Sequence, residues 1–216
     1  MTRDVQLDFT RRPVEAIAAD VVVAGFFCDD RPLRGATGRL DWRLCGQISD
    51  LLASGCLDEE PGSAVLLPGS GPVKATRVLL LGLGKRREFS LDRAEEAMRD
   101  AIARCLDLGQ QVIALSPLGI APDDFARHAE VLIDGLSRAV REARPSEERE
   151  NERELLLRIS LSEKQFREAK ERLPSLIADR SDPRISLNGE GRAPLRTGLS
   201  LDGDAAHTEK PHADPN

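Results

Sequence analysis

Aromatic residues are scarce in this sequence: they make up 3% of the chain, tyrosine is absent and there is a single tryptophan. Proteins that bind single-stranded nucleic acid usually stack its bases on aromatic rings. The formal net charge of -6 also supplies no overall positive field for a phosphate backbone. Association with DNA is therefore a weak alternative, supported only by short basic segments such as Lys85–Arg87.

Long hydrophobic runs are missing as well. The longest apolar runs have the length of a strand, far below the roughly 20 residues that span a bilayer. The N-terminus MTRDVQLDF has acidic residues before any apolar stretch, unlike a signal peptide. We therefore expect a cytoplasmic protein that does not enter membranes.

Cysteines are few and have no CxxC spacing. In a reducing compartment this pattern favours buried thiols over disulfides or metal ligands. The cysteines in question are Cys28, Cys45, Cys56 and Cys105.

Strand-like apolar segments alternate with amphipathic helices along most of the chain. Asp20–Phe27 and Arg77–Leu83 are almost continuously apolar, as strands are when both faces of a parallel sheet are covered. Val5–Phe9 alternates apolar and polar residues, which is typical of an edge strand. The alternation of strands and helices predicts an α/β fold, a three-layer α/β/α sandwich with a mixed, largely parallel sheet.

Several helix boundaries can be predicted from capping residues. A first helix presents its apolar face over residues 40–52. Ser90 is placed to cap a second helix, and Pro122 opens a third. Ser162 and Gln165 have the spacing of a capping box for the last helix.

The chain of 216 residues has room for one domain of ordinary size and an extension. We expect residues 1–177 to form the domain. Residues 178–216 contain too few apolar side chains to offset the entropy of ordering, so they are expected to form a disordered tail.

The segment Leu33–Leu91 resembles the N-terminal domain of the leucyl aminopeptidases, the cytosol aminopeptidase family. The similarity lies in the stretches LRGATGRLDWRLCGQISDLL and GSAVLLPGSGPVKATRVLLLGLGKRREFSL, and it extends over about Asp20–Ile177. It implies a macro-domain-like sandwich. In that family the two-metal chemistry lies in a second, C-terminal domain, from which the sequence after Ile177 departs.

The resemblance thus implies an accessory or regulatory module with no catalytic residue, metal ligand or cofactor, rather than a metalloaminopeptidase. The nearest match to the family's catalytic motif NTDAEGR is Asn188–Arg192 (NGEGR), which lacks the aspartate and lies in the expected tail. A role in protein interaction follows, with a full-length aminopeptidase or another protein as the partner.

Two glycine loops between a strand and a helix are candidate sites for a phosphate or another anion, because a helix N-terminus favours anions. Macro domains hold the phosphates of ADP-ribose on a glycine-rich loop. Neither loop completes a GxGxxG or Walker pattern, and the consecutive glycines of macro domains are absent. A nucleotide-like or ADP-ribose-type ligand is the alternative function; otherwise the glycines only permit tight turns. The candidate residues are Arg34, Gly35, Gly38, Gly82, Gly84 and Lys85.

Nucleophilic hydrolysis finds little support in the sequence. The tripeptide Gly69–Gly71 is a turn and not a GxSxG elbow. His128 is expected on the surface of a helix or with a hydrogen-bond partner. Trp42 is expected to pack against the domain rather than to bind a ligand.

Overall fold

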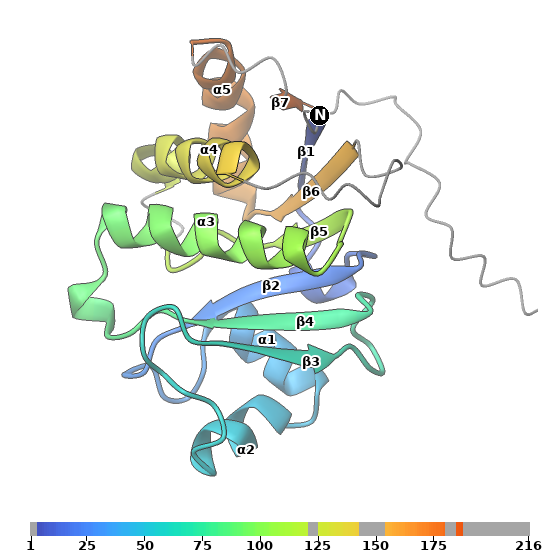
Figure 1. Ribbon diagram of the computed structural model, residues 1–216, viewed down its shortest axis with the longest axis vertical. Helices are drawn as coiled ribbons and strands as arrows, with labels where there is room; N and C mark the ends of the chain where they lie inside the picture. Colours follow the sequence, from blue (N-terminus) through green and yellow to red (C-terminus); the bar gives the residue numbers. More distant parts are fainter. Residues whose placement is uncertain (1–3, 121–124, 143–153, 180–184, 188–216) are drawn as a thin grey trace, which may run out of the picture.

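The computed structural model describes residues 4–120, 125–142, 154–179 and 185–187 (Figure 1). Within these residues seven strands form one sheet in the order β3-β4-β2-β5-β6-β1-β7. Neighbouring strands are parallel, except that β3 is antiparallel to β4. The strands are β1 (Asp4–Thr10), β2 (Val21–Phe26), β3 (Ala64–Pro68), β4 (Arg77–Gly82), β5 (Val112–Leu115), β6 (Glu154–Ser160) and β7 (Ile185–Leu187).

Helices pack on both faces of this sheet, as the sequence predicted (Figure 1). Together with the mixed, largely parallel sheet they make a three-layer α/β/α sandwich. On one face lie α1 (Gly35–Arg43) and α2 (Gln47–Ala53); on the other lie α3 (Leu91–Asp107), α4 (Phe125–Glu142) and α5 (Glu163–Asp179).

Two hydrophobic cores hold the layers together, one on each side of the sheet. Successive residues of a strand point to opposite faces, so Val21 and Val23 join the core beneath α3, α4 and α5, whereas Val22 and Ala24 join the core beneath α1. All four side chains are fully buried. Because a slip of one residue would exchange the two faces, this packing fixes the register of β2 and the position of its carboxyl end.

Two predicted helix caps are confirmed. Ser90 accepts a hydrogen bond from the backbone N–H of Arg93 at the start of α3. At the start of α5, the backbone N–H of Ser162 donates to Gln165 Oε1 at 2.9 Å, and the N–H of Gln165 donates to Ser162 Oγ at 3.3 Å. These reciprocal bonds are the predicted capping box.

The first predicted helix is wrong in its extent. It begins earlier, at Gly35, and is split into α1 and α2. Cys45 and Gly46 adopt the left-handed conformation, with φ of 56° and 86°, and interrupt the helix. The Asp41 carboxylate then accepts the N–H groups of Ile48 and Ser49 and caps α2.

The predicted edge strand is also misplaced. β1 pairs with β6 on one side and with β7 on the other, so it is an interior strand. β7 arises from the range in which a disordered tail was expected, and Ile185 is buried beside β1. The rest of that range beyond Asp179 lies outside the described residues, as does Pro122. Among the residues the structure describes, no helix has the length and apolar character needed to cross a membrane.

Candidate ligand-binding cleft

A cleft of about 550 Å³ lies at the carboxyl ends of the parallel strands. The chain leaves β2 toward α1 on one face of the sheet and leaves the neighbouring β5 toward α4 on the other. In open α/β sheets, such a switch point is where ligands characteristically bind. The volume falls within the range of small-molecule sites.

The start of α1 forms one wall of the cleft. The Thr37 hydroxyl donates a hydrogen bond of 2.7 Å to the carbonyl of Gly25 in β2, which fixes the first turn of α1 over the end of that strand. Gly35 has φ of 61° and open space where a Cβ would be. The backbone of this turn is therefore accessible, and its N–H groups offer the positive end of the helix dipole.

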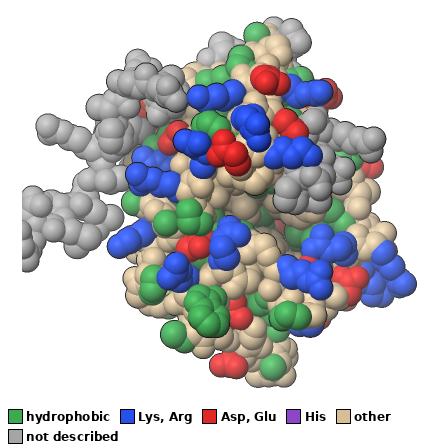
Figure 2. Space-filling view, turned by 180° about the vertical axis from the view of Figure 1, so that it is seen from behind, with side chains coloured by type: hydrophobic (Ala, Val, Ile, Leu, Met, Phe, Trp, Pro, Cys, Tyr) green, Lys and Arg blue, Asp and Glu red, His purple; other side chains and the backbone are tan. Residues whose placement is uncertain are grey.

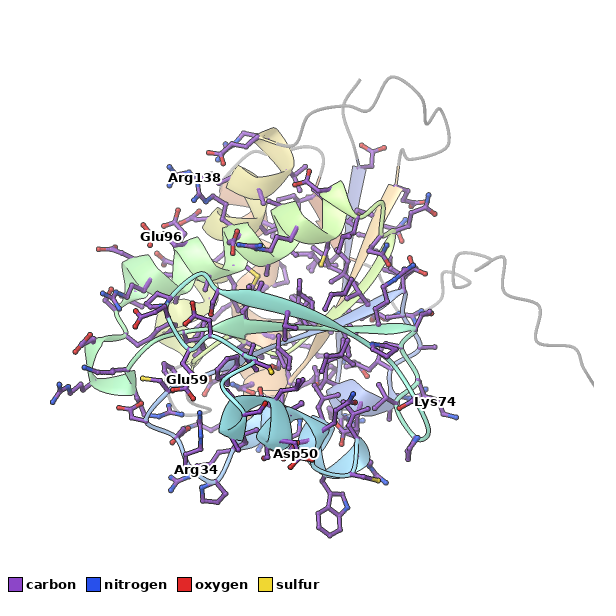
Figure 3. All side chains as sticks on the ribbon, turned by 60° about the horizontal axis from the view of Figure 1, so that its bottom comes forward. Arg34, Asp50, Glu59, Lys74, Glu96 and Arg138 are labelled. Atoms are coloured by element: carbon purple, nitrogen blue, oxygen red, sulfur yellow. The ribbon has the colours of Figure 1, made fainter. Side chains whose placement is uncertain are left out.

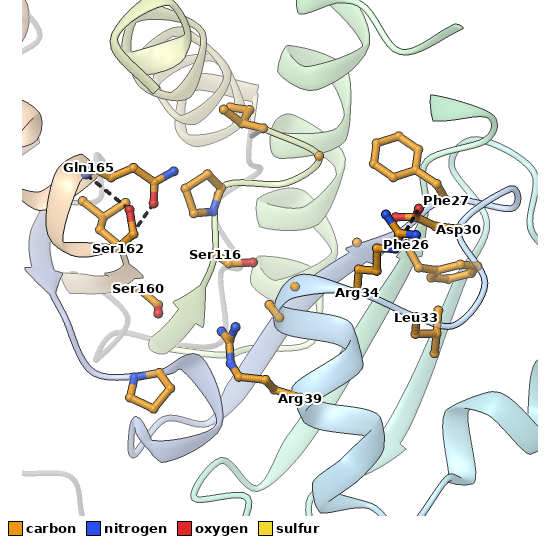
Figure 4. Close-up of a pocket in the computed structure, with 18 of the residues that line it drawn as sticks. Phe26, Phe27, Asp30, Leu33, Arg34, Arg39, Ser116, Ser160, Ser162 and Gln165 are labelled. Atoms are coloured by element: carbon orange, nitrogen blue, oxygen red, sulfur yellow. Dashed lines mark hydrogen bonds and ion pairs between the residues drawn. The ribbon is translucent and has the colours of Figure 1, made fainter. Parts of the chain in front are cut away.

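Arginine side chains supply most of the charge around the cleft. Arg34 and Arg86 both pair with Asp30, with Arg34 Nε at 3.8 Å from Asp30 Oδ1. Figure 4 shows Arg34 beside Asp30 and shows Arg39 reaching from α1 toward Ser116 and Ser160.

Carboxylates next to the cleft neutralise part of the charge of its arginines. Arg39 Nε lies 3.2 Å from Glu15 Oε2, and Arg11 lies 3.2 Å from Glu163. The four arginines of the described lining therefore pair with three carboxylates: Asp30, which lines the cleft and serves two of them, and Glu15 and Glu163, which lie outside the lining. The excess of one positive charge and the α1 N-terminus together favour an anionic ligand.

Aromatic packing makes the wall beside Asp30. The rings of Phe27 and Phe89 meet edge to face with centroids 5.1 Å apart. The guanidinium of Arg86 lies 4.1 Å from the centroid of Phe27, and its backbone N–H donates to Asp29 Oδ1 at 2.9 Å. A Cβ at Gly119 would meet the Phe89 ring at 2.5 Å, so only glycine fits between this wall and the loop after β5.

Only one of the two predicted glycine loops lies at the cleft. Arg34 and Gly35 line the cleft, and Gly38 lines a shallower hollow beside it. Gly82, Gly84 and Lys85 are outside the lining of both spaces. Gly82 is the last residue of β4, and the turn after it contains Gly84, which packs against Pro61, and the exposed Lys85, which pairs with Glu88 at 3.9 Å.

Sequence reasoning missed most of the cleft's polar side chains. They come from the carboxyl ends of strands and the loops that follow them, from the second turn of α1 and from the first turn of α5. A search of the residues directly after each buried strand would have found those from the loops, since parallel strands end at one edge of the sheet. The missed residues are Arg11, Asp30, Arg39, Ser116, Ser160, Ser162 and Gln165.

The expectations for Trp42 and the cysteines need correction. Trp42 is 81% exposed and does not pack against the domain. Cys45 and Cys56 are exposed, whereas Cys105 is buried and burial raises its pKa to about 12. In the described ranges, no three His, Cys, Asp or Glu side chains are grouped so that they could hold a metal ion. The side chain of His128 lies outside the described residues.

A three-layer sandwich with a crevice at its switch point defines a class of ligand-binding α/β domains. Residues 22–140, more than half of the chain, match the family model for the N-terminal domain of the cytosol aminopeptidase family. The chain therefore belongs to the cytosol aminopeptidase family, as the resemblance indicated.

Individual relatives agree with this assignment. A probable cytosol aminopeptidase of Methylobacillus flagellatus is 38% identical over 109 residues, which are 50% of this chain and 22% of that protein. The chain spans about a fifth of the length of the curated relatives that it matches.

Solved structures share the fold. A variant of tomato leucine aminopeptidase superposes with a TM-score of 0.57 and 19% identity, over 78% of this chain and 35% of that chain. A Trypanosoma brucei macrodomain in complex with ADP gives a TM-score of 0.60 and 13% identity, over 77% and 68%. The macro-like fold is confirmed.

Proposed function

We propose that this domain is a non-catalytic accessory module that binds a nucleotide-type ligand in the cleft. The observation that carries the proposal is the placement of Arg34, Arg39 and the α1 N-terminus around a space of about 550 Å³ at the switch point of the sheet. Guanidinium groups and helix N-terminal N–H groups are the donors that phosphates prefer. The T. brucei macrodomain, with the same fold, has been solved with ADP bound.

The arrangement of Arg34 favours an exchange of partners on binding. Its side chain is 71% exposed and its contact with Asp30 is long, at 3.8 Å. Asp30 keeps Arg86 as a partner when Arg34 moves away. A phosphate can therefore recruit Arg34 without leaving the Asp30 carboxylate unpaired.

The test is thermal unfolding of the purified chain with ADP-ribose, ADP and pyrophosphate. Ligand at 100 times its dissociation constant stabilises by about 2.7 kcal/mol, which raises Tm by roughly 5–11 °C for a chain of this size. Arg34→Gln is expected to weaken binding about tenfold or more, as loss of a hydrogen bond from a charged group does. Lys74→Gln is the matched control, since Lys74 lies at the opposite end of the sheet from Arg34 (Figure 3). A Tm that no ligand moves would refute the proposal.

Protein interaction is the second candidate function, and the exposed edge of β3 favours it. β3 is the outermost strand of the described sheet at that side, and Leu66 in it is 40% exposed. An open edge with an apolar side chain can pair with a strand of a partner such as a full-length aminopeptidase. Co-elution of the two proteins, lost in Leu66→Lys but kept in Leu108→Lys just after α3, would support this role. Separate elution at high concentration would oppose it.

The non-catalytic part of the proposal has its own test. We expect no hydrolysis of leucine amides by the purified chain with manganese or zinc, because the described residues contain no cluster of metal-ligating side chains. An inert protein purified in the same way is the control. Activity that follows this chain through purification would overturn the non-catalytic role.

A further inference from the structure

A second hollow, of about 400 Å³, continues the cleft along α1. Leu33, Gly35 and Arg39 line both spaces, so the two are contiguous. Trp42 and Arg43, at the C-terminal end of α1, also line the hollow. One surface therefore leads from the arginines of the cleft to an indole ring.

Trp42 is unusual among the large hydrophobic side chains of the described chain because it is 81% exposed. A tryptophan that packs normally removes 150–250 Å² of largely apolar surface from water. Trp42 leaves most of this surface in water and lacks the stabilisation that burial would give. Gly38 precedes Trp42 by one helical turn and also lines the hollow.

The charges beside the ring suit a ligand with both an anionic and an aromatic part. Arg39 belongs to both spaces, and the buried Glu15 orients it through a contact of 3.2 Å. Gly35 and Trp42 are separated by about 10 Å along the helix axis, at 1.5 Å per residue. This spacing is within reach of a single nucleoside diphosphate.

We propose that Trp42 is the platform on which the base of the bound nucleotide stacks while its phosphates lie at Arg34, Arg39 and the α1 N-terminus. This inference rests on the proposed nucleotide-binding function and adds a specificity-determining residue to it. A ligand with a planar base is preferred over a phosphate compound without one, because base–indole stacking adds to affinity and tolerates any base.

The chain offers a direct readout, because Trp42 is its one tryptophan and it has no tyrosine. ADP and pyrophosphate are titrated while intrinsic fluorescence is excited at the red edge of tryptophan absorption. ADP is expected to quench the emission, and pyrophosphate is expected to bind with little quenching. By calorimetry, Trp42→Ala should weaken ADP binding roughly 5- to 150-fold, the effect of losing one stacked base. It should leave pyrophosphate binding unchanged, and Trp42→Phe should restore part of the ADP affinity.

Leu108→Ala serves as the control for removal of an exposed hydrophobic side chain, and it should bind both ligands normally. ADP binding without quenching, at equal affinity in the native chain and Trp42→Ala, would overturn the stacking role and leave the cleft function standing. Failure of both ADP and pyrophosphate to bind would instead remove the cleft function and the stacking role together. Self-association that disappears in Trp42→Ala, without ADP quenching, would place Trp42 in a protein interface and would also overturn the proposal.

Discussion

Replacement of Gly38 by alanine should destabilise the domain, although alanine is the better helix former. Gly38 lies inside α1, where alanine would normally add about 1 kcal/mol of stability. A Cβ at this position would lie 2.9 Å from the carbonyl carbon of Leu33 and nearer still to its oxygen, whereas ordinary contact begins at 3.4 Å. Helix and loop must therefore separate by about half an ångström or more.

The expected cost of this overlap is about 1–3 kcal/mol, as for an added methylene in a packed region. It outweighs the gain in helix propensity and leaves a net loss of about 1 kcal/mol, because a backbone carbonyl cannot move aside as a flexible side chain can. The loop that moves carries Arg34 and leads into Gly35 at the start of α1, so ligand affinity should fall as well.

Thermal unfolding of the native chain and Gly38→Ala, without ligand, measures the effect. A loss of about 1 kcal/mol lowers Tm by about 2–4 °C for a chain of this size. The overlap with the Leu33 carbonyl lowers the expected Tm of Gly38→Ala, whereas helix propensity alone would raise it. A Tm that rises by 2–4 °C would therefore refute this expectation and would show that the loop before α1 has room for a side chain.

Three further predictions concern stability and reactivity. In the native protein a thiol reagent should modify exposed Cys45 and spare buried Cys105, whose pKa of about 12 suppresses the thiolate; mass spectrometry after labelling with and without urea checks this. Ser162→Ala should lower Tm by about 2–4 °C through loss of about 1 kcal/mol of capping energy, whereas Ser175→Ala, in the exposed part of α5, should change it less. Burial raises the pKa of Asp8 above 3.8, and the attraction of Arg158 opposes this shift only in part. The folded chain therefore binds the Asp8 proton more tightly than the unfolded chain does. The contribution of Asp8 to stability is consequently lost as the pH rises through its pKa in the folded chain. Asp8→Asn should consequently gain stability relative to the native chain between acid and neutral pH; urea unfolding at both ends of this window that gives a constant difference would contradict the prediction.

The elements that the sequence predicted well are those in which local signals and burial agree. The run of apolar residues in β4 is buried on both faces of the sheet, and the spacing of Ser162 and Gln165 produces its capping box. The split between α1 and α2 could not be predicted in this way. Its cause is the left-handed conformation of Cys45, a residue type that rarely adopts it, and the Asp41 side chain that caps the following helix.

The candidate site was only partly predictable for a similar reason. Glycine loops mark where the backbone turns, and one of the predicted glycines, Gly35, lines the cleft. They do not say which side chains turn inward: Arg86 reaches the cleft, but its neighbour Lys85 points elsewhere and pairs with Glu88. That difference is set by the stacking of Arg86 on Phe27, a contact between segments far apart in the sequence.

The net charge of -6 and an arginine-lined cleft are compatible, because they act over different distances. At physiological salt, charges on the surface are screened beyond about 8 Å. The electrostatic interaction of a small ligand in the cleft therefore comes mainly from the arginines and carboxylates next to it. A nucleic acid strand extends over many such lengths and would also meet the acidic side chains that are interspersed with basic ones on the face in Figure 2. The same charges that oppose a polyanion therefore leave a ligand with two phosphates almost unaffected. Its affinity should come from contacts with Arg34, Arg39 and the α1 N-terminus that are shorter than this screening length. The affinity should therefore change only weakly with salt concentration.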